Sequence, residues 1–484
     1  MKTFLFYDVE TSGLNHAFDQ ILTFACIRTD LELNEIERQS ITICLRKDIV
    51  PSPNAFLVHG LTYDELKRGI NEYNAALKIH KILNTSGTIS LGYNSLGFDD
   101  EFLRFMFYRN LLDPYSHQYA NGCARMDILP MTVLFRVFHP KSLNWPQIDG
   151  KPTLKLDSIS RENNFITSGR AHEALNDVEA VIELSKKMFQ QKDIWKYCLD
   201  FFNKTRDEVR INSIDKKLDI QNTQFRICLM MSASFGSTVN YMAPVIHLGS
   251  SLVYKNQSLW LRLDQDDILG MDSGMDIKDT FVIRKRAADA LIVLPALERF
   301  WDKLPEQSRN KARENIEKIS NKRFFEFILY HSNYKYPFIP NMDPDAALYQ
   351  DGFFSFQEKK EINLVHQSLK ELTKTALHSD TIENIKKLNC LRIKTLANRI
   401  LARNFDDIKG YTEDTEFSLY ISRLKSSLEE DQIIGYKNDK KLNCRQALEE
   451  LKEKQKTLLN PDQDQKKMLD WLKKYTESLY NSRP

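Results

Sequence analysis

The stretch TFLFYDVET, residues 3–11, decides the fold, because an apolar run leads directly into two acids. The run predicts a buried strand, on which residues two apart share a face. The carboxylates of Asp8 and Glu10 therefore point the same way. Like charges on a core strand repel each other unless protons or cations neutralise them, and hard divalent cations such as Mg²⁺ bind carboxylates readily. Two acids with this spacing and no others nearby are more often solvated side chains at a strand end. The other acids of the chain therefore decide the interpretation.

Three further residues fit the same site. Asp99 follows the apolar stretch 88–93 and opens a predicted helix. Asp177 lies beside the apolar stripe of a predicted helix over 171–188, where a carboxylate needs a partner that a metal would supply. His172, at the start of that helix, can take a proton from water, since its unperturbed pKa is about 6.5. Four acids and one histidine together predict a two-metal nuclease site, although His172 alone also fits an ordinary surface position.

These five residues resemble the DEDDh family of 3′-to-5′ exonucleases. Beyond them, the whole chain resembles the bacterial exonuclease I family, which is specific for single-stranded DNA. The stretches that carry this resemblance are GYNSLGFDDEFLR at 92–104, FYRNLLDPY at 107–115, LNWP at 143–146, MAPV at 242–245, LYQDGFFS at 348–355 and ARNF at 402–405. Matches that run from residue 4 to past residue 400 are far more specific than the five residues alone.

The resemblance implies hydrolysis of the terminal phosphodiester bond of single-stranded DNA in the 3′-to-5′ direction. It implies release of 5′-mononucleotides, processive digestion, and a place in DNA repair and recombination. Asp8, Glu10, Asp99 and Asp177 would hold two Mg²⁺ ions, for which Mn²⁺ could substitute. His172 would deprotonate the attacking water, and Glu10 could also contact the terminal 3′-hydroxyl.

The resemblance also indicates five residues that hold the strand. Lys155 stands where the family usually has arginine, so it keeps the charge but loses the bidentate fork. Arg104 would touch a phosphate, and Lys204 matches a basic position where the first two domains meet. Tyr115 and Tyr119 would stack on bases, although the second aromatic in the family is typically tryptophan. For each of the five, ordinary surface or core placement is an equally good interpretation.

The order of predicted elements indicates an α/β fold with a mixed sheet, which the resemblance identifies as RNase H-like. Strands are predicted near 3–10, 20–28, 41–46 and 88–93, helices near 62–84, short β-like runs over 225–263, and helices near 285–320. The predicted domains are an exonuclease domain at 1–200, an SH3-like barrel-containing domain at 201–354 and an all-helical domain at 355–484.

Composition limits the classes of protein. A chain of 484 residues is too long for one ordinary core. A net charge of +2 means that DNA binding would depend on local basic clusters. Seven scattered cysteines without a CxxC pair indicate reduced thiols in a bacterial cytoplasm. No stretch of about 18 apolar residues occurs, which argues against membrane insertion.

The expected partners come from the resemblance alone. It implies a monomer that binds single-stranded DNA and the acidic C-terminal tail of single-stranded-DNA-binding protein. Two alternatives stay open. A DEDDh exoribonuclease would carry the same five residues but not the downstream matches, and a catalytically inactive DNA-binding scaffold would commonly lack one of the acids.

Overall fold

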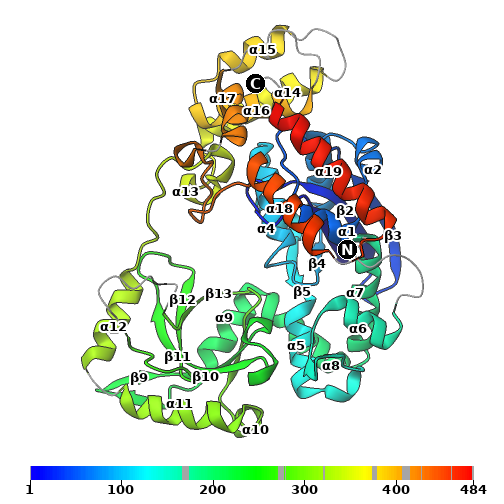
Figure 1. The fold of residues 1–484 in the computed structure, drawn as a ribbon. Coiled ribbons are helices and arrows are strands. Elements are labelled where there is room, and N and C mark those ends of the chain that lie inside the picture. Colours follow the sequence, from blue (N-terminus) through cyan, green and yellow to red (C-terminus); the bar gives the residue numbers. More distant parts are fainter. Residues whose placement is uncertain are drawn as a thin grey trace.

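The structure is a computed structural model, and three regions follow one another along the chain (Figure 1). A nuclease region contains the first sheet, a middle region contains a second sheet, and a helical region ends the chain. An extended segment over 334–341 joins the last two regions and passes on the side away from the nuclease sheet (Figure 1). The described residues are 2–165, 174–270, 277, 280–319, 322–372, 379–405, 415–426, 428–458 and 460–481.

The nuclease region is built on a five-stranded mixed sheet in the order β3-β2-β1-β4-β5. Its antiparallel strands are β1 (Thr3–Thr11), β2 (Ile21–Thr29) and β3 (Glu35–Thr42), whereas β4 (Thr88–Gly92) and β5 (Ala124–Asp127) extend it in parallel. The central strand β1 is buried on both faces. Phe4 and Phe6 face α5 (Ile128–Phe138) and α7 (Ala174–Phe189), while Leu5 and Tyr7 face α3 (Glu72–Leu83) and α4 (Asp99–Arg109). The predicted mixed α/β architecture is therefore confirmed.

One prediction in this region was wrong in its bounds, because the strand expected near 41–46 is β3, which ends at Thr42. The helices expected near 62–84 are α2 (Tyr63–Lys67) and α3. They are separate helices because the chain between them pairs with the end of β3. Ile70 donates its N–H to the Thr42 carbonyl there, and a Cβ at Gly69 would lie 2.6 Å from the same oxygen.

The middle region contains a five-stranded antiparallel sheet in the order β13-β12-β11-β10-β14. Its strands are β10 (Ile227–Met231), β11 (Met242–Ser250), β12 (Gln257–Arg262), β13 (Val282–Arg286) and β14 (Ile292–Pro295). The helices expected from residue 285 onward begin later, with α10 (Glu298–Trp301) and α11 (Glu306–Lys318). The first part of that stretch is strand, because β13 pairs with β12 and β14 with β10.

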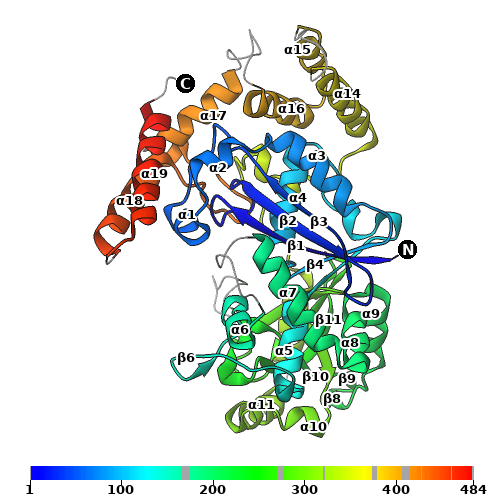
Figure 2. The ribbon, with the colours of Figure 1, turned by 90° about the vertical axis from the view of Figure 1, so that its right-hand side faces the viewer.

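The last region is helical, as predicted, and packs directly against the nuclease region. Its helices are α14 (Phe356–Leu372), α15 (Ser379–Lys386), α16 (Leu391–Asn404), α17 (Thr415–Lys425), α18 (Cys444–Thr457) and α19 (Gln463–Asn481). Both views show α18 and α19 beside α1 (Pro53–His59) (Figures 1 and 2). Phe56 of α1 forms one apolar cluster with Leu451 and Leu472. The domain boundaries remain a prediction.

The remaining elements are short or lie at the edges of the regions. They are α6 (Leu156–Asn163), α8 (Lys192–Leu199), α9 (Lys204–Ser213), α12 (Lys322–Asn333), α13 (Leu348–Asp351), and the two-stranded pairs β6 (Gln147–Ile148) with β7 (Lys151–Pro152) and β8 (Leu218–Ile220) with β9 (Thr223–Phe225). Within the described residues, no helix is long and apolar enough to cross a membrane. All seven cysteines are described, and none of them is part of a disulfide.

Candidate active site

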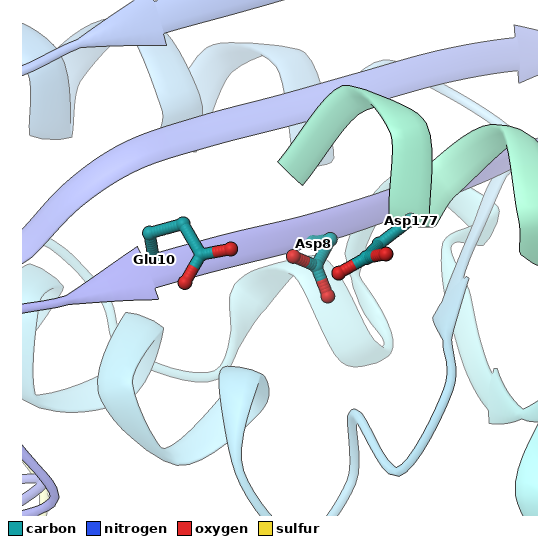
Figure 3. A group of neighbouring side chains, drawn as sticks. All are labelled: Asp8, Glu10 and Asp177. Atoms are coloured by element: carbon teal, nitrogen blue, oxygen red, sulfur yellow. The ribbon is translucent and has the colours of Figure 1, made fainter. Parts of the chain in front are cut away.

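Three carboxylates from two elements meet on one face of the nuclease sheet. Asp8 and Glu10 are two apart on β1 and share its face toward α7, as strand geometry requires. Asp177 lies in the first turn of α7 and reaches toward Asp8 (Figure 3). One oxygen from each of the three side chains lies within 4.8 Å of the others. The structure thus brings together three of the four predicted acids as a group that could hold a metal ion.

The fourth acid, Asp99, approaches from the start of α4. It is the first residue of that helix, as predicted, and only 4% exposed. Its Oδ1 accepts the N–H of Val9 at 3.1 Å, so it is tied to the β1 backbone between Asp8 and Glu10. His172 is the fifth predicted residue and lies outside the described residues.

Burial and mutual repulsion make these acids hard to ionise. Burial, followed by the charges of Asp99, Glu10 and Asp177, raises the pKa of Asp8 well above its ordinary value. Burial and the neighbouring Asp177 and Asp99 raise the pKa of Glu10 to about 8. Burial is also the main cause that raises the pKa of Asp99 to about 7. A bound divalent cation would remove the repulsion, and an all-carboxylate donor set suits a hard cation such as Mg²⁺.

The loop that delivers Asp99 is held by a residue that the sequence analysis missed. Asp127, at the end of β5, is 1% exposed and accepts backbone N–H groups from Asn94 at 2.9 Å and Leu96 at 3.0 Å. It also caps α5 through the N–H of Leu129. The available signal was an acid directly before the apolar helical run of residues 128–138, where it can cap the helix. Asp127 thus fixes the turn from which α4 and Asp99 start.

The residues predicted to hold DNA are spread over several environments. Arg104 is buried and forms ion pairs with Asp100, at 2.5 Å, and with Glu101. Its guanidinium charge is therefore already paired with carboxylates of the protein. Tyr115 is half-buried, with the Arg104 guanidinium 5.6 Å from its ring centre. The other three side chains are exposed, namely Tyr119, Lys155 and Lys204. Their contacts with a strand remain predictions.

Comparison with known proteins identifies the class and then the family. The model of a family described as "Exonuclease" matches residues 5–185, which carry the sheet and the acids. The chain is therefore an exonuclease with an RNase H-like catalytic region. A second model, "Exonuclease I C-terminal domain", matches residues 342–479. With the relatives described next, this shows that the chain belongs to the exonuclease I family, whose members are exodeoxyribonucleases and hence phosphodiester hydrolases.

The relatives match along nearly their whole length. Exodeoxyribonuclease I of Buchnera aphidicola subsp. Acyrthosiphon pisum is 31% identical over 433 residues, which cover 83% of this chain and 97% of the relative. Exodeoxyribonuclease I of Escherichia coli K12 is 29% identical over 434 residues, which cover 85% of this chain and 87% of the relative. A structure of E. coli exonuclease I in complex with a dT13 oligonucleotide labelled 5cy has a TM-score of 0.80 at 25% identity and covers 99% of this chain and 100% of that one. The zinc-bound form of the E. coli enzyme with single-stranded DNA has a TM-score of 0.79 at 25% identity.

Proposed function

We propose that the chain degrades single-stranded DNA from the 3′ end and releases 5′-mononucleotides. The observation that carries this function is the gathering of Asp8, Glu10 and Asp177 within 4.8 Å on the sheet of an exonuclease I family member. Structures of the E. coli relative with single-stranded oligonucleotides support the substrate class. A role in DNA repair, processive digestion and a cytoplasmic location follow from the family, and the free cysteines suit a reducing compartment.

The chemistry assigns separate tasks to the five residues. Asp8, Glu10, Asp99 and Asp177 would hold two divalent cations, Mg²⁺ or in its place Mn²⁺, which when bound acidify water and stabilise the leaving oxygen. His172 would accept the proton of the attacking water. Glu10 would also orient the terminal 3′-hydroxyl, which favours cutting at an end over cutting within the strand.

The other two regions would guide the strand. We take the middle sheet with its helices to be the SH3-like domain, at 201–354, and residues 355–484 to be the helical domain. Lys155 and Lys204 would contact phosphates, Tyr115 and Tyr119 would stack on bases, and Arg104 would reach phosphate only by exchanging an ion pair. The extended segment over 334–341 would help enclose the strand between the regions (Figure 1).

A time course on end-labelled strands tests the function. With Mg²⁺, a 3′-labelled oligonucleotide should release labelled mononucleotide at once, whereas the label of a 5′-labelled one should appear in small products only when digestion reaches that end. The variant Asp8→Ala should be inactive, and Asp30→Asn, in the exposed turn after β2, should match the wild type. Release of mononucleotides from the 5′ end, or full activity of Asp8→Ala, would contradict the proposal.

Two further measurements separate the alternatives and the partner. DNA should be degraded much faster than RNA of equal length. An exoribonuclease would instead prefer RNA, and a scaffold would degrade neither. Binding of the acidic C-terminal peptide of single-stranded-DNA-binding protein, followed by calorimetry, tests the expected partner. Sedimentation of the free protein tests the expected monomer.

A further inference from the structure

The loop over 12–19 connects the acid-bearing end of β1 to β2. Asp19 closes this loop by accepting the Ser12 hydroxyl at 2.9 Å and the Asn15 N–H at 2.8 Å. The fit is close, since a Cβ at Gly13 would overlap the Asp19 carboxylate. The loop begins two residues after Glu10, so its position constrains the end of the strand that carries this acid.

A second loop, over 433–441 in the helical region, packs against the first. Asn15 donates its Nδ2–H to Asp439 Oδ2 at 2.6 Å, across 424 positions of sequence. The Tyr436 hydroxyl lies 3.4 Å from Nδ1 of His16, the next residue of the first loop. The helical region thus touches the segment that directly follows the catalytic strand.

The same contact reaches the segment that carries Asp99. The His16 ring centre lies 5.7 Å from that of Phe98, the residue before Asp99, and 4.9 Å from that of Phe102. The Tyr436 ring centre lies 4.9 Å from that of Phe105, one turn further along α4. One small unit therefore contacts both elements that supply acids to the site.

The loop over 433–441 is itself firmly held. The second oxygen of Asp439 accepts the N–H of Lys437 at 3.1 Å, and a Cβ at Gly435 would overlap the Asp439 carboxylate. At its end, buried Lys441 donates to the Asp48 carbonyl at 3.1 Å and to the Tyr420 hydroxyl at 2.8 Å. A support fixed in this way can hold its neighbour in one position.

We propose that Asn15 and Asp439 are positioning residues for the active site, through which the helical region holds the β1 end and the start of α4 in register. The pair acts through Glu10 and Asp99 and does not touch the DNA. The acid geometry then depends on residues far outside the segment 5–185 matched by the exonuclease model. This inference rests on the proposed function.

A donor–acceptor swap tests the pair. In Asn15→Asp two carboxylates face each other, which breaks the 2.6 Å bond. In Asp439→Asn the single amide oxygen can accept from Asn15 or from the N–H of Lys437 but not from both, so one of these two hydrogen bonds is lost. The double variant restores both, with the donor and acceptor roles of the pair reversed. The carboxylate introduced at position 15 keeps an oxygen for the N–H of Ala17, and the amide introduced at position 439 keeps one for the N–H of Lys437.

We expect each single variant to lower kcat on a single-stranded oligonucleotide by about 10-fold, the lower end of losses seen when a supporting hydrogen bond to a metal site is removed. KM for DNA should stay unchanged, because the pair does not hold the strand. Mn²⁺ affinity, measured by electron paramagnetic resonance of the free ion, should fall in each single variant. The double variant should recover both kcat and Mn²⁺ affinity to within about 3-fold of the wild type.

The matched control is Asn34→Asp. This substitution breaks a similar amide–carboxylate bond, to Asp30 at 2.9 Å, in the turn at the other end of β2. It should change neither kcat nor the affinity for Mn²⁺. Unchanged kcat in both single variants, a rise in KM alone, or a double variant as poor as the singles would overturn the proposal. An inactive wild type would count against the proposed function instead, while the Mn²⁺ measurements would still decide whether the pair positions the acids. If a single variant fails to fold, a folded double variant with normal Mn²⁺ affinity supports the pairing, and a double variant without it overturns it.

Discussion

The nuclease region contains two sets of carboxylates, one partly buried and one fully buried, whose pKa values shift in opposite directions. In the active site, burial and like charges raise the pKa of Asp8 and Glu10. In the ionic network between the nuclease and helical regions, burial also opposes ionisation, but the guanidinium groups outweigh it. There Arg403 and Arg46 lower the pKa of Asp48, and Arg109 and Arg46 lower that of Glu72 to about 2.

The partners explain the difference. In the ionic network, Asp48 lies 2.9 Å from Arg46 Nε and 3.0 Å from an Arg403 nitrogen, and Glu72 lies 2.8 Å from Arg46 and 2.6 Å from Arg109. In the active site the close neighbours of each acid include other acids. Removing one partner of a buried ion pair destabilises the fold, because the other charge is then left uncompensated. Carboxylates grouped with one another instead retain the capacity to bind a cation.

The largest effect is expected from Asp8→Asn. The substitution removes one charge from the grouped acids and should lower the hydrolysis rate of single-stranded DNA by about 10³-fold, the upper end for loss of one electrostatic group. Because it also relieves repulsion, the metal-free variant should melt at a higher temperature than the wild type. Calorimetry in EDTA and a rate measurement in Mg²⁺ check the two parts. A lower melting temperature in EDTA would argue against repulsion among these acids.

The matching change in the ionic network is Asp48→Asn. It leaves the buried Arg46 and Arg403 without their shared carboxylate, and breaking a buried pair from one side costs about 3 kcal/mol or more. Urea unfolding should show this loss with Mg²⁺ present or absent. A free energy of unfolding within about 1 kcal/mol of the wild type would mean that the network contributes little to the stability of the fold.

The sequence predicted the acids better than their supports. Alternation on a strand is a local rule, so the shared face of Asp8 and Glu10 followed from residues 3–11 alone. Helical periodicity is also a local feature, and it placed Asp99 at the start of one helix and Asp177 beside the apolar stripe of another. The contact between Asn15 and Asp439 spans 424 positions and leaves no periodic signal. Long-range packing of this kind cannot be derived from local pattern.

The same reason explains the errors in the fold. The segments of β13 and β14 are strands because they pair with β12 and β10, and the expected helix there ignored these partners. The helical region was predicted correctly because its elements are long and amphipathic. Local patterns therefore predict whether a long element is a helix or a strand. The type and the bounds of a short element depend on the neighbouring strands with which it pairs.

The pH dependence of stability should also differ between the two sets. Folded Glu10 keeps its proton up to a pKa of about 8, whereas an unfolded glutamate loses it near 4.5, so the folded state binds more protons between these values. The metal-free protein should lose stability as the pH rises from about 5 to 8, on the order of 3 kcal/mol in total. For Asp48, whose folded pKa is lowered, stability should instead be lost as the pH falls below about 4. Urea unfolding in EDTA across this range measures both slopes, and saturating Mg²⁺ should flatten only the first.

The smallest effect is expected at Asp127, which belongs to neither set. It is buried, its close partners are three backbone N–H groups, and burial raises its pKa to about 6. In Asp127→Asn the amide NH₂ cannot accept a hydrogen bond, so at least one of these groups loses its partner and the turn before Asp99 loosens. We expect about a 10-fold lower kcat and a loss of about 2 kcal/mol of stability, since a hydrogen bond to a charged group contributes about 1.5–3 kcal/mol. If kcat stays at the wild-type level while the melting temperature falls, Asp127 supports only the fold. Asp127 would then be a structural carboxylate, and Asp99, at the end of the same turn, a functional one.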